Sequence, residues 1–220
     1  SLREERSGLA TKNTPRQPSL MKLKHLLLAA GTVTAAAFLP AQAEAQEEVG
    51  FTRATDFSIF YPAQVGSEFD SVEGVRFNIF YAKNNNLRGL DLGLLGVGQW
   101  AGDVQGVQLN FLGSIVEGDM TGWQTGLYTQ TDGEFTGLKG GFINLQGEKL
   151  VGWQYGAVSL ADGEVTGLQT GLFNKAGSVN GVQLGLINFT DQLYGLQIGL
   201  LNFNVEADPL YVFPIVNFSF

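Results

Sequence analysis

Residues 167–202 read GLQTGLFN, KAGSVN, GVQLGLIN, FTDQLY, GLQIGLLN, which is one eight-residue phrase three times with six-residue spacers. The leading glycines Gly167, Gly181 and Gly195 are 14 residues apart. Upstream, in steps of 14 to 17 residues, the phrase begins at Gly152, Gly137, Gly122, Gly106 and Gly89. A period of this kind indicates that the chain is built from copies of one supersecondary unit.

Two kinds of side chain alternate within each phrase. In residues 167–174, one set of alternate positions carries Gly, Gln, Gly and Phe, and the other carries Leu, Thr, Leu and Asn. A period of two indicates a β-strand with two different faces. We therefore expect each phrase to be a strand with one aliphatic face and one small, amide-bearing face, and each spacer to be a turn.

The N-terminal part of the sequence has the pattern of an exported protein. Residues 21–45, MKLKHLLLAAGTVTAAAFLPAQAEA, combine two lysines, an apolar run and an A-x-A site, which predicts a signal peptide cleaved after Ala45. A membrane anchor is disfavoured because the apolar run is short and rich in alanine. Residues 1–20 are expected to be an upstream, non-native segment, and residues 46–220 a single β-repeat domain.

The residue inventory excludes several kinds of chemistry. The only histidine, His25, lies in the expected leader, and the chain has no cysteine. The expected exported domain therefore lacks the residues for Ser-His-Asp or Cys-His catalysis and for His- or Cys-ligated metals. Without the three acidic and six basic residues of the first 45, that domain has 18 acidic and 7 basic residues, a net charge of −11. This charge argues against nucleic acid as a partner, and we expect neither a cofactor nor an enzyme.

Turn signals separate the expected strands. Pairs such as Asp132-Gly133 and Asp162-Gly163 lie midway between phrases and favour hairpins. From these turns we count about eleven strands by their period-two patterning. They begin with residues 56–63 and 75–83 and end with residues 211–220, where Pro214 predicts an edge or bulged position.

Two architectures fit this pattern. In the first, an antiparallel meander closes into a small outer-membrane-type β-barrel, with the aliphatic face on lipid and the Gly/Gln face inside. In the second, each 14–17-residue repeat is one coil of a β-solenoid. A solenoid is expected to place aliphatic residues inside, namely Leu168, Leu172, Leu184 and Leu186, and to expose the glycine-lined face. Gly133, Gly147 and Gly163 stack on one edge in a solenoid, whereas in a meander Gly147 lies at the opposite end from the other two.

The remaining signals divide between the two architectures. A recurrent Asn favours the solenoid, at Asn144, Asn174, Asn188 and Asn202. Aromatic residues suited to interfacial girdles favour the barrel, namely Trp123, Trp153, Tyr128, Tyr155 and Tyr194, as does the alternating C-terminus that ends at Phe220. We predict the barrel, with the solenoid as the alternative.

The best candidate for a functional site is the third position of the phrase. It forms an interior polar column of Gln108, Gln124, Lys139, Gln154, Gln169, Gln183 and Gln197. This column could line a narrow channel for small solutes, or fill the interior with amides that bond to one another. Lys139 is expected to pair with an interior acid such as Asp91. Acidic turns such as 132–134 and 162–164 are expected to be solvated tips rather than calcium sites.

The phrases GLQTGLFN, GVQLGLIN and GLQIGLLN, together with VRFNIFYAKNNNLRGLDLGLLG and FPIVNFSF, resemble a family of bacterial surface repeat-containing proteins over residues 56–220. The resemblance implies export and association with the envelope or cell surface, and implies no catalytic residue. The sequence thus predicts a Gram-negative outer-membrane or surface protein with a structural or interaction role. Its expected partners are outer-membrane lipid and the barrel-assembly machinery. The alternative is a secreted or periplasmic solenoid acting as a scaffold or adhesin.

Overall fold

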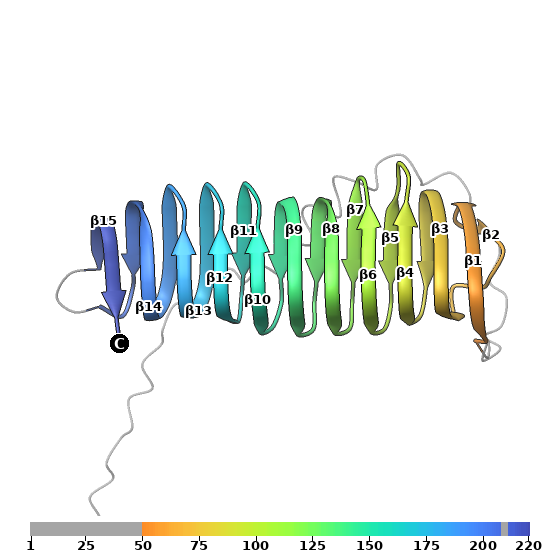
Figure 1. The fold of residues 1–220 in the computed structure, drawn as a ribbon, viewed down its shortest axis with the longest axis horizontal. Coiled ribbons are helices and arrows are strands. Elements are labelled where there is room, and N and C mark those ends of the chain that lie inside the picture. The colour runs from red at the N-terminus through yellow and green to blue at the C-terminus, as the bar shows by residue number, and fades with distance from the viewer. Residues whose placement is uncertain (1–49, 208–210) are drawn as a thin grey trace, which may run out of the picture. The chain divides into compact units, whose positions relative to one another are not determined.

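The fold is a β-solenoid, not a barrel (Figure 1). The computed structural model describes residues 50–207 and 211–220, so the expected upstream segment and signal peptide lie outside the described residues. The strands are β1 (Thr52–Phe60), β2 (Ala63–Gln64), β3 (Ser71–Asn84), β4 (Leu87–Gly93), β5 (Val97–Trp100), β6 (Val104–Asn110), β7 (Gly113–Val116), β8 (Met120–Thr131), β9 (Phe135–Gln146), β10 (Leu150–Tyr155), β11 (Val158–Ala161), β12 (Glu164–Thr170), β13 (Phe173–Leu184), β14 (Ile187–Asn204) and β15 (Val212–Ser219).

Each coil has two sides. We call the long side the row formed by 71–78, β4, β6, 120–125, 135–140, β10, β12, 178–184 and 192–198. The short side is the row formed by 81–84, β5, β7, 128–131, 143–146, β11, 173–176 and 187–190. Neighbouring coils pair in parallel, and like positions of the phrase lie in register, as in Gly167↔Gly181↔Gly195. The predicted antiparallel meander is therefore wrong, whereas the all-β, repeat-built part of the prediction is correct.

The Asp-Gly turns lie at the corners between coils instead of at hairpin tips. Gly133 N donates to Gly118 O (3.2 Å), Gly147 N to Thr131 O (2.8 Å) and Gly177 N to Gly163 O (3.2 Å). All these turns thus stack on one edge, which is the arrangement that distinguishes a solenoid from a meander. A tight corner from the short side to the long side needs the same turn residues as a hairpin, so turn chemistry alone did not separate the two folds. The spacing of the Asp-Gly turns also predicts one unbroken strand over residues 164–176, but the chain turns between β12 and β13.

Glycine begins each phrase because of backbone conformation. Nine glycines from Gly74 to Gly195 have φ between +124° and +149°, a range that residues with a side chain rarely adopt. A Cβ on Gly152 would lie 2.1 Å from the carbonyl oxygen of Gly137 in the preceding coil. The glycine column therefore sets the close stacking of coils on the long side.

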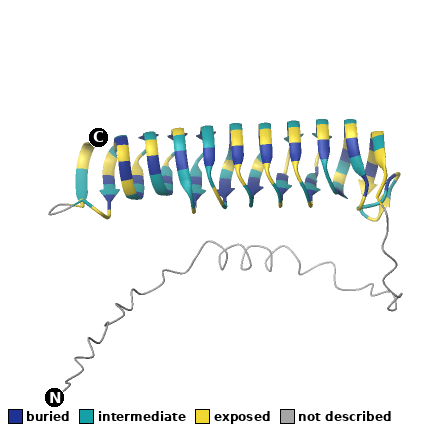
Figure 2. Cartoon of the chain, turned by 90° about the horizontal axis from the view of Figure 1, so that it is seen from below, coloured by how far each residue is buried: buried dark blue, intermediate teal, exposed yellow. Residues whose placement is uncertain are grey.

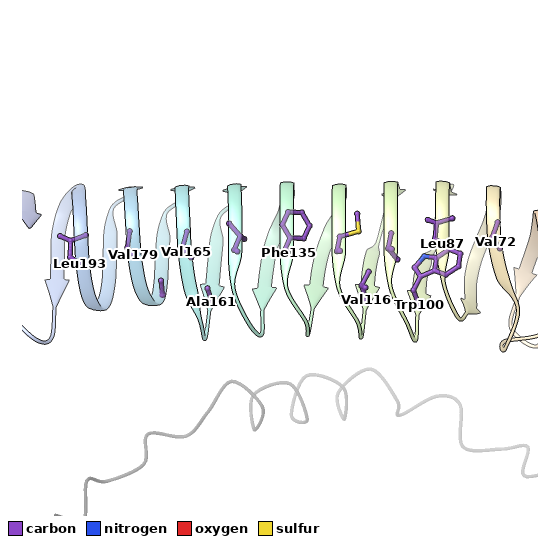
Figure 3. Close-up of a cluster of buried hydrophobic side chains, with 13 residues drawn as sticks. Val72, Leu87, Trp100, Val116, Phe135, Ala161, Val165, Val179 and Leu193 are labelled. Atoms are coloured by element: carbon purple, nitrogen blue, oxygen red, sulfur yellow. The ribbon is translucent and has the colours of Figure 1, made fainter. Parts of the chain in front are cut away.

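The faces of the solenoid are the reverse of those expected for this fold. Leu172 and Leu186 are exposed and Leu168 and Leu184 are partly exposed, whereas the amide-bearing positions are buried. Figure 2 shows buried and exposed residues alternating along the strands. The interior apolar cluster is a narrow row along the stack that includes Val72, Leu87, Trp100, Phe135, Val165 and Leu193 (Figure 3). Most of the other buried positions carry polar side chains.

Antiparallel strands close both ends of the stack. At the N-terminal end β2 pairs with β1, and at the C-terminal end β15 pairs with β14. β15 is the last strand in the sheet order, its register shifts between Gly199 and Asn202, and Ile215 has a φ of 69°. The edge or bulged position predicted for Pro214 is therefore confirmed.

Candidate functional site: a sealed polar interior and two opposite edges

The structure brings all seven residues of the predicted interior polar column together inside the solenoid, each with no exposed surface. Parallel, in-register stacking places each amide one coil from the next. Gln169 Nε2 donates to Gln154 Oε1 (2.9 Å), Gln183 Nε2 to Gln169 Oε1 (2.7 Å), and Gln197 Nε2 to Gln183 Oε1 (2.7 Å). Asn217 of β15 continues this glutamine ladder by donating to Gln197 Oε1 (2.7 Å).

The glutamine ladder also crosses the interior. Gln169 Nε2 donates to the carbonyl oxygens of Ser159 and Lys175 on the short side, and Gln183 and Gln197 make equivalent bonds to Phe189 and Phe203. The bonds to Lys175, Phe189 and Phe203 tie the long side to the short side within one coil, and the bond to Ser159 ties it to the preceding coil. With no barrel there is no barrel lumen, so the channel interpretation of this column is wrong.

A second ladder of asparagines explains the recurrent Asn of the phrase. Asn174 Nδ2 donates to Asn188 Oδ1 (2.8 Å), and Asn188 Nδ2 donates to Asn202 Oδ1 (2.8 Å). Each also donates to a backbone carbonyl of the next coil, for example Asn188 to Ile198 O (2.9 Å). Bonded amides of this kind stabilise a polar interior that would be costly if its groups were left unpaired.

Lys139 interrupts the glutamine ladder. Its Nζ donates to Leu145 O (2.6 Å) and Gln146 Oε1 (3.0 Å) and lies 5.2 Å from the ring centre of Phe135. A lysine side chain has no acceptor. Gln154 Nε2, which in the ladder pattern would donate to the residue at position 139, accordingly has no hydrogen-bond partner.

Lys139→Gln should raise the free energy of unfolding by about 1–3 kcal/mol, because it supplies the acceptor that the buried Gln154 amide lacks. Lys139→Met is the matched control, since it removes the charge without adding an acceptor. Chemical denaturation of both variants measures the difference. Equal stabilities for the Gln and Met variants would show that the missing acceptor at position 139 has no energetic consequence.

The expected partner of Lys139, Asp91, is instead bound to Arg76. Arg76 donates from Nε to Asp91 Oδ1 and from Nη2 to Asp91 Oδ2, both at 2.8 Å, and its guanidinium lies 3.8 Å from the ring centre of Trp100. Asn110 and Trp100 also donate to Asp91 Oδ2. Burial alone would raise the pKa of the Asp91 carboxyl, but attraction by Arg76 and these hydrogen bonds outweigh it and hold the pKa below its ordinary value.

Sequence reasoning missed Arg76 as a member of the column. It stacks in register on Asp91, which stacks on Gln108. The signal was present, because residues 74–77 read GVRF and match the start of the phrase GVQL with Arg in place of Gln. The polar column thus continues toward the N-terminus as a buried ion pair.

The two edges of the coils differ completely in charge. At one edge of the stack, the short side of each coil leads into the long side of the next. We call this row of corners the acidic edge, and it consists of residues 85–86, 101–103, 117–119, 132–134, 147–149, 162–164, 177–178, 191–192 and 205–207. These segments hold ten acidic residues and one lysine, Lys149. In strands of alternating direction, successive acidic turns would lie at opposite ends, whereas here they share this one edge.

Several acids of this edge have a structural role. Asp103 Oδ1 accepts a hydrogen bond from Asp119 N (3.0 Å), and Asp119 Oδ1 accepts one from Glu134 N (2.8 Å). Each carboxylate therefore caps a backbone amide of the next coil. Among the described residues, no group of three or more acidic or histidine side chains is placed to hold a metal ion.

The opposite edge carries no charge. Here the long side of each coil leads into its short side. We call this row of corners the apolar edge, and it consists of residues 79–80, 94–96, 111–112, 126–127, 141–142, 156–157, 171–172, 185–186 and 199–201. These segments contain only Gly, Ala, Leu, Ile and Phe. Eight of the nine present a large side chain that is 48–72% exposed, namely Phe80, Leu94, Phe111, Leu127, Phe142, Leu172, Leu186 and Leu200. An exposed apolar surface of this extent is typical of interaction sites.

A groove of about 920 Å³ lies along the N-terminal half of this surface. Its walls include Phe57, Phe77, Leu92, Phe111 and Leu127. The outer columns of the long side extend the apolar surface, and Trp123 and Trp153 stand in one of them, separated by Leu138. Of the predicted girdle residues, Tyr194 lies away from this surface, near the acidic edge.

No family model, curated protein or solved structure matches the chain. In the part of the chain that the structure describes, no helix is long and apolar enough to cross a membrane.

Proposed function

We propose that this chain is an exported, non-catalytic β-solenoid that serves as an interaction scaffold in the bacterial envelope and binds its partner through the apolar edge. The observation that carries this proposal is the separation of charge between the two edges. Ten acidic residues lie on one edge, and none lies on the other. Such a cross-section has one surface suited to water and one suited to an apolar partner.

The interior supports the same function. The column residues have no exposed surface and bond to one another and to the backbone of the short side, so they hold the scaffold together rather than bind a solute. The predicted signal peptide and the resemblance to bacterial surface repeat-containing proteins support an envelope location. The residue inventory supports a non-catalytic role, because the only histidine is His25.

Fractionation of cells expressing the full chain tests this proposal. The protein should sediment with the envelope, and the double variant Leu172→Asp/Leu186→Asp should lower the envelope-to-soluble ratio about tenfold or more, because each leucine contributes about 1.5–3 kcal/mol when buried.

The double variant Tyr194→Asp/Val205→Asp is the matched control. It removes two similarly exposed apolar side chains (61% and 49%, against 58% and 48%) and adds the same charge near the acidic edge. It should remain with the envelope. A soluble wild-type protein, or equal release of both double variants, would disprove the proposed function.

A further inference from the structure

We propose that the partner of the apolar edge is a lipid bilayer, on which the solenoid lies lengthwise with its apolar edge inserted at the interface; this inference rests on the proposed function. The apolar edge follows the whole stack, which spans about 40 Å at the usual spacing of paired strands. Every coil from 79–80 to 199–201 presents its corner to the same side. A straight row of apolar corners of this length can contact a bilayer along its whole length without a conformational change in the protein.

The backbone of the apolar edge is prepared for an environment without water. Leu127 N donates to Phe111 O, Leu172 N to Ala157 O and Leu186 N to Leu172 O, all at 2.9–3.0 Å. Corner amides are thus bonded between coils. An irregular turn is ordinarily excluded from lipid because its unpaired backbone groups are costly there. At this edge the stacking of coils lowers that cost, a property that binding to a water-rich protein surface would not require.

The tryptophans beside the apolar edge also favour lipid. Trp123 and Trp153 lie on the outer surface of the long side, each three residues before the apolar corner of its coil, and both are about two-fifths exposed. Tryptophan is the residue type enriched where a protein meets the membrane interface.

The acids lie where they do not oppose this contact. The long side of about seven residues separates the two edges by roughly 20 Å at the usual rise of a strand. This separation exceeds the Debye length of about 8 Å at physiological ionic strength, so acidic headgroups and the acidic edge interact weakly. Binding should therefore depend on buried apolar area and change little with salt.

Vesicle flotation of protein purified from cells expressing the full chain tests the inference. The protein should float with phosphatidylcholine vesicles, and also with mixed phosphatidylcholine–phosphatidylglycerol vesicles at physiological salt. Two double variants of the apolar edge test its contact with lipid: Phe111→Asp/Leu127→Asp in the N-terminal half and Leu172→Asp/Leu186→Asp in the C-terminal half. Each should lower partitioning into vesicles about tenfold or more, because both halves of the apolar edge contact the bilayer. Tyr194→Asp/Val205→Asp should float like the wild type.

A second readout does not depend on recovery of the variants. Tryptophan emission should shift to the blue when vesicles are added, and lipids with brominated acyl chains should quench it. The buried Trp100 should contribute nothing to the change, so Trp123→Phe/Trp153→Phe should abolish it. Circular dichroism establishes that each variant is folded.

The outcomes separate this inference from the proposed function. A wild-type protein that sediments with envelopes but does not float with vesicles would overturn the lipid partner and leave a protein partner. A different outcome is that the wild type does not float and sediments as a dimer, while the apolar-edge variants sediment as monomers. That result would assign the apolar edge to binding a second copy of the chain. Loss of flotation in only one half-variant would overturn the lengthwise orientation.

Discussion

Gly152→Ala should lower the free energy of unfolding by about 3–5 kcal/mol, because the new methyl group meets backbone that cannot move aside. Its Cβ would lie 2.1 Å from Gly137 O, and the φ of +131° is itself unfavourable for alanine. Both neighbouring coils are fixed by the same glycine column, so the stack cannot relax by a local shift. Urea or guanidinium unfolding of the purified protein measures the loss.

Gly113→Ala is the control for this substitution. Gly113 has no positive φ, and a Cβ there would lie 3.4 Å from Tyr128 O, an ordinary contact. The change should therefore stay within about 1 kcal/mol of the wild type, with a small gain from the reduced entropy of the unfolded chain. Similar losses at the two positions would mean that the glycine column is not what sets the coil stacking.

Asp91→Asn should lower the free energy of unfolding by about 3–5 kcal/mol, because it leaves the Arg76 guanidinium buried without a counter-charge. Neither side chain of this ion pair has exposed surface. Arg76→Gln/Asp91→Gln should recover most of the loss, since two glutamines at these positions would stack on Gln108, whose Oε1 already accepts a hydrogen bond from Gln124 Nε2 (3.2 Å). If the double variant is as unstable as Asp91→Asn, stacked glutamines cannot replace the buried ion pair at these two positions.

The same pair predicts a pH dependence. The pKa of Asp91 is lowered in the folded state, so its stabilising contribution is complete above the ordinary pKa of an aspartate and is lost as pH falls through the lowered folded value. Unfolding free energies of the wild type should therefore fall between about pH 5 and pH 2. The unfolding free energy of the Arg76→Gln/Asp91→Gln variant should fall less over the same pH range. Some of the decrease remains in this variant, because the pKa of Asp70 is also lowered in the folded state.

The sequence alone predicted the repeat, the strands and the amide column, but not how the strands are connected in space. A period of two is common to parallel and antiparallel strands, and Asp132-Gly133 is as suited to a coil corner as to a hairpin. The recurrent asparagine pointed to stacking, and the bond from Asn174 to Asn188 shows why. That signal was outweighed by the assumption that a solenoid must place its aliphatic side chains inside.

That assumption failed for a physical reason. Parallel stacking places Gln183 between Gln169 and Gln197 at bonding distance, so buried amides can satisfy most of their hydrogen bonds with one another and with the backbone. The aliphatic side chains, such as Leu172 and Leu186, are then left outside. The alternation correctly separated two faces, but only the register between coils decides which face is inside. The apolar edge could not be located before the corners were known.

The antiparallel C-terminal strand has a consequence for molecular size. Every coil offers the next one a parallel edge of the same register, so an uncovered β14 would accept another copy of the chain as readily as its own next coil. β15 covers that edge with an antiparallel strand, and Pro214 in β15 has no backbone N–H to donate to a strand of another copy. A second copy therefore cannot add a parallel coil to β14, so stacking of copies on this strand is prevented by β15 whatever the protein concentration.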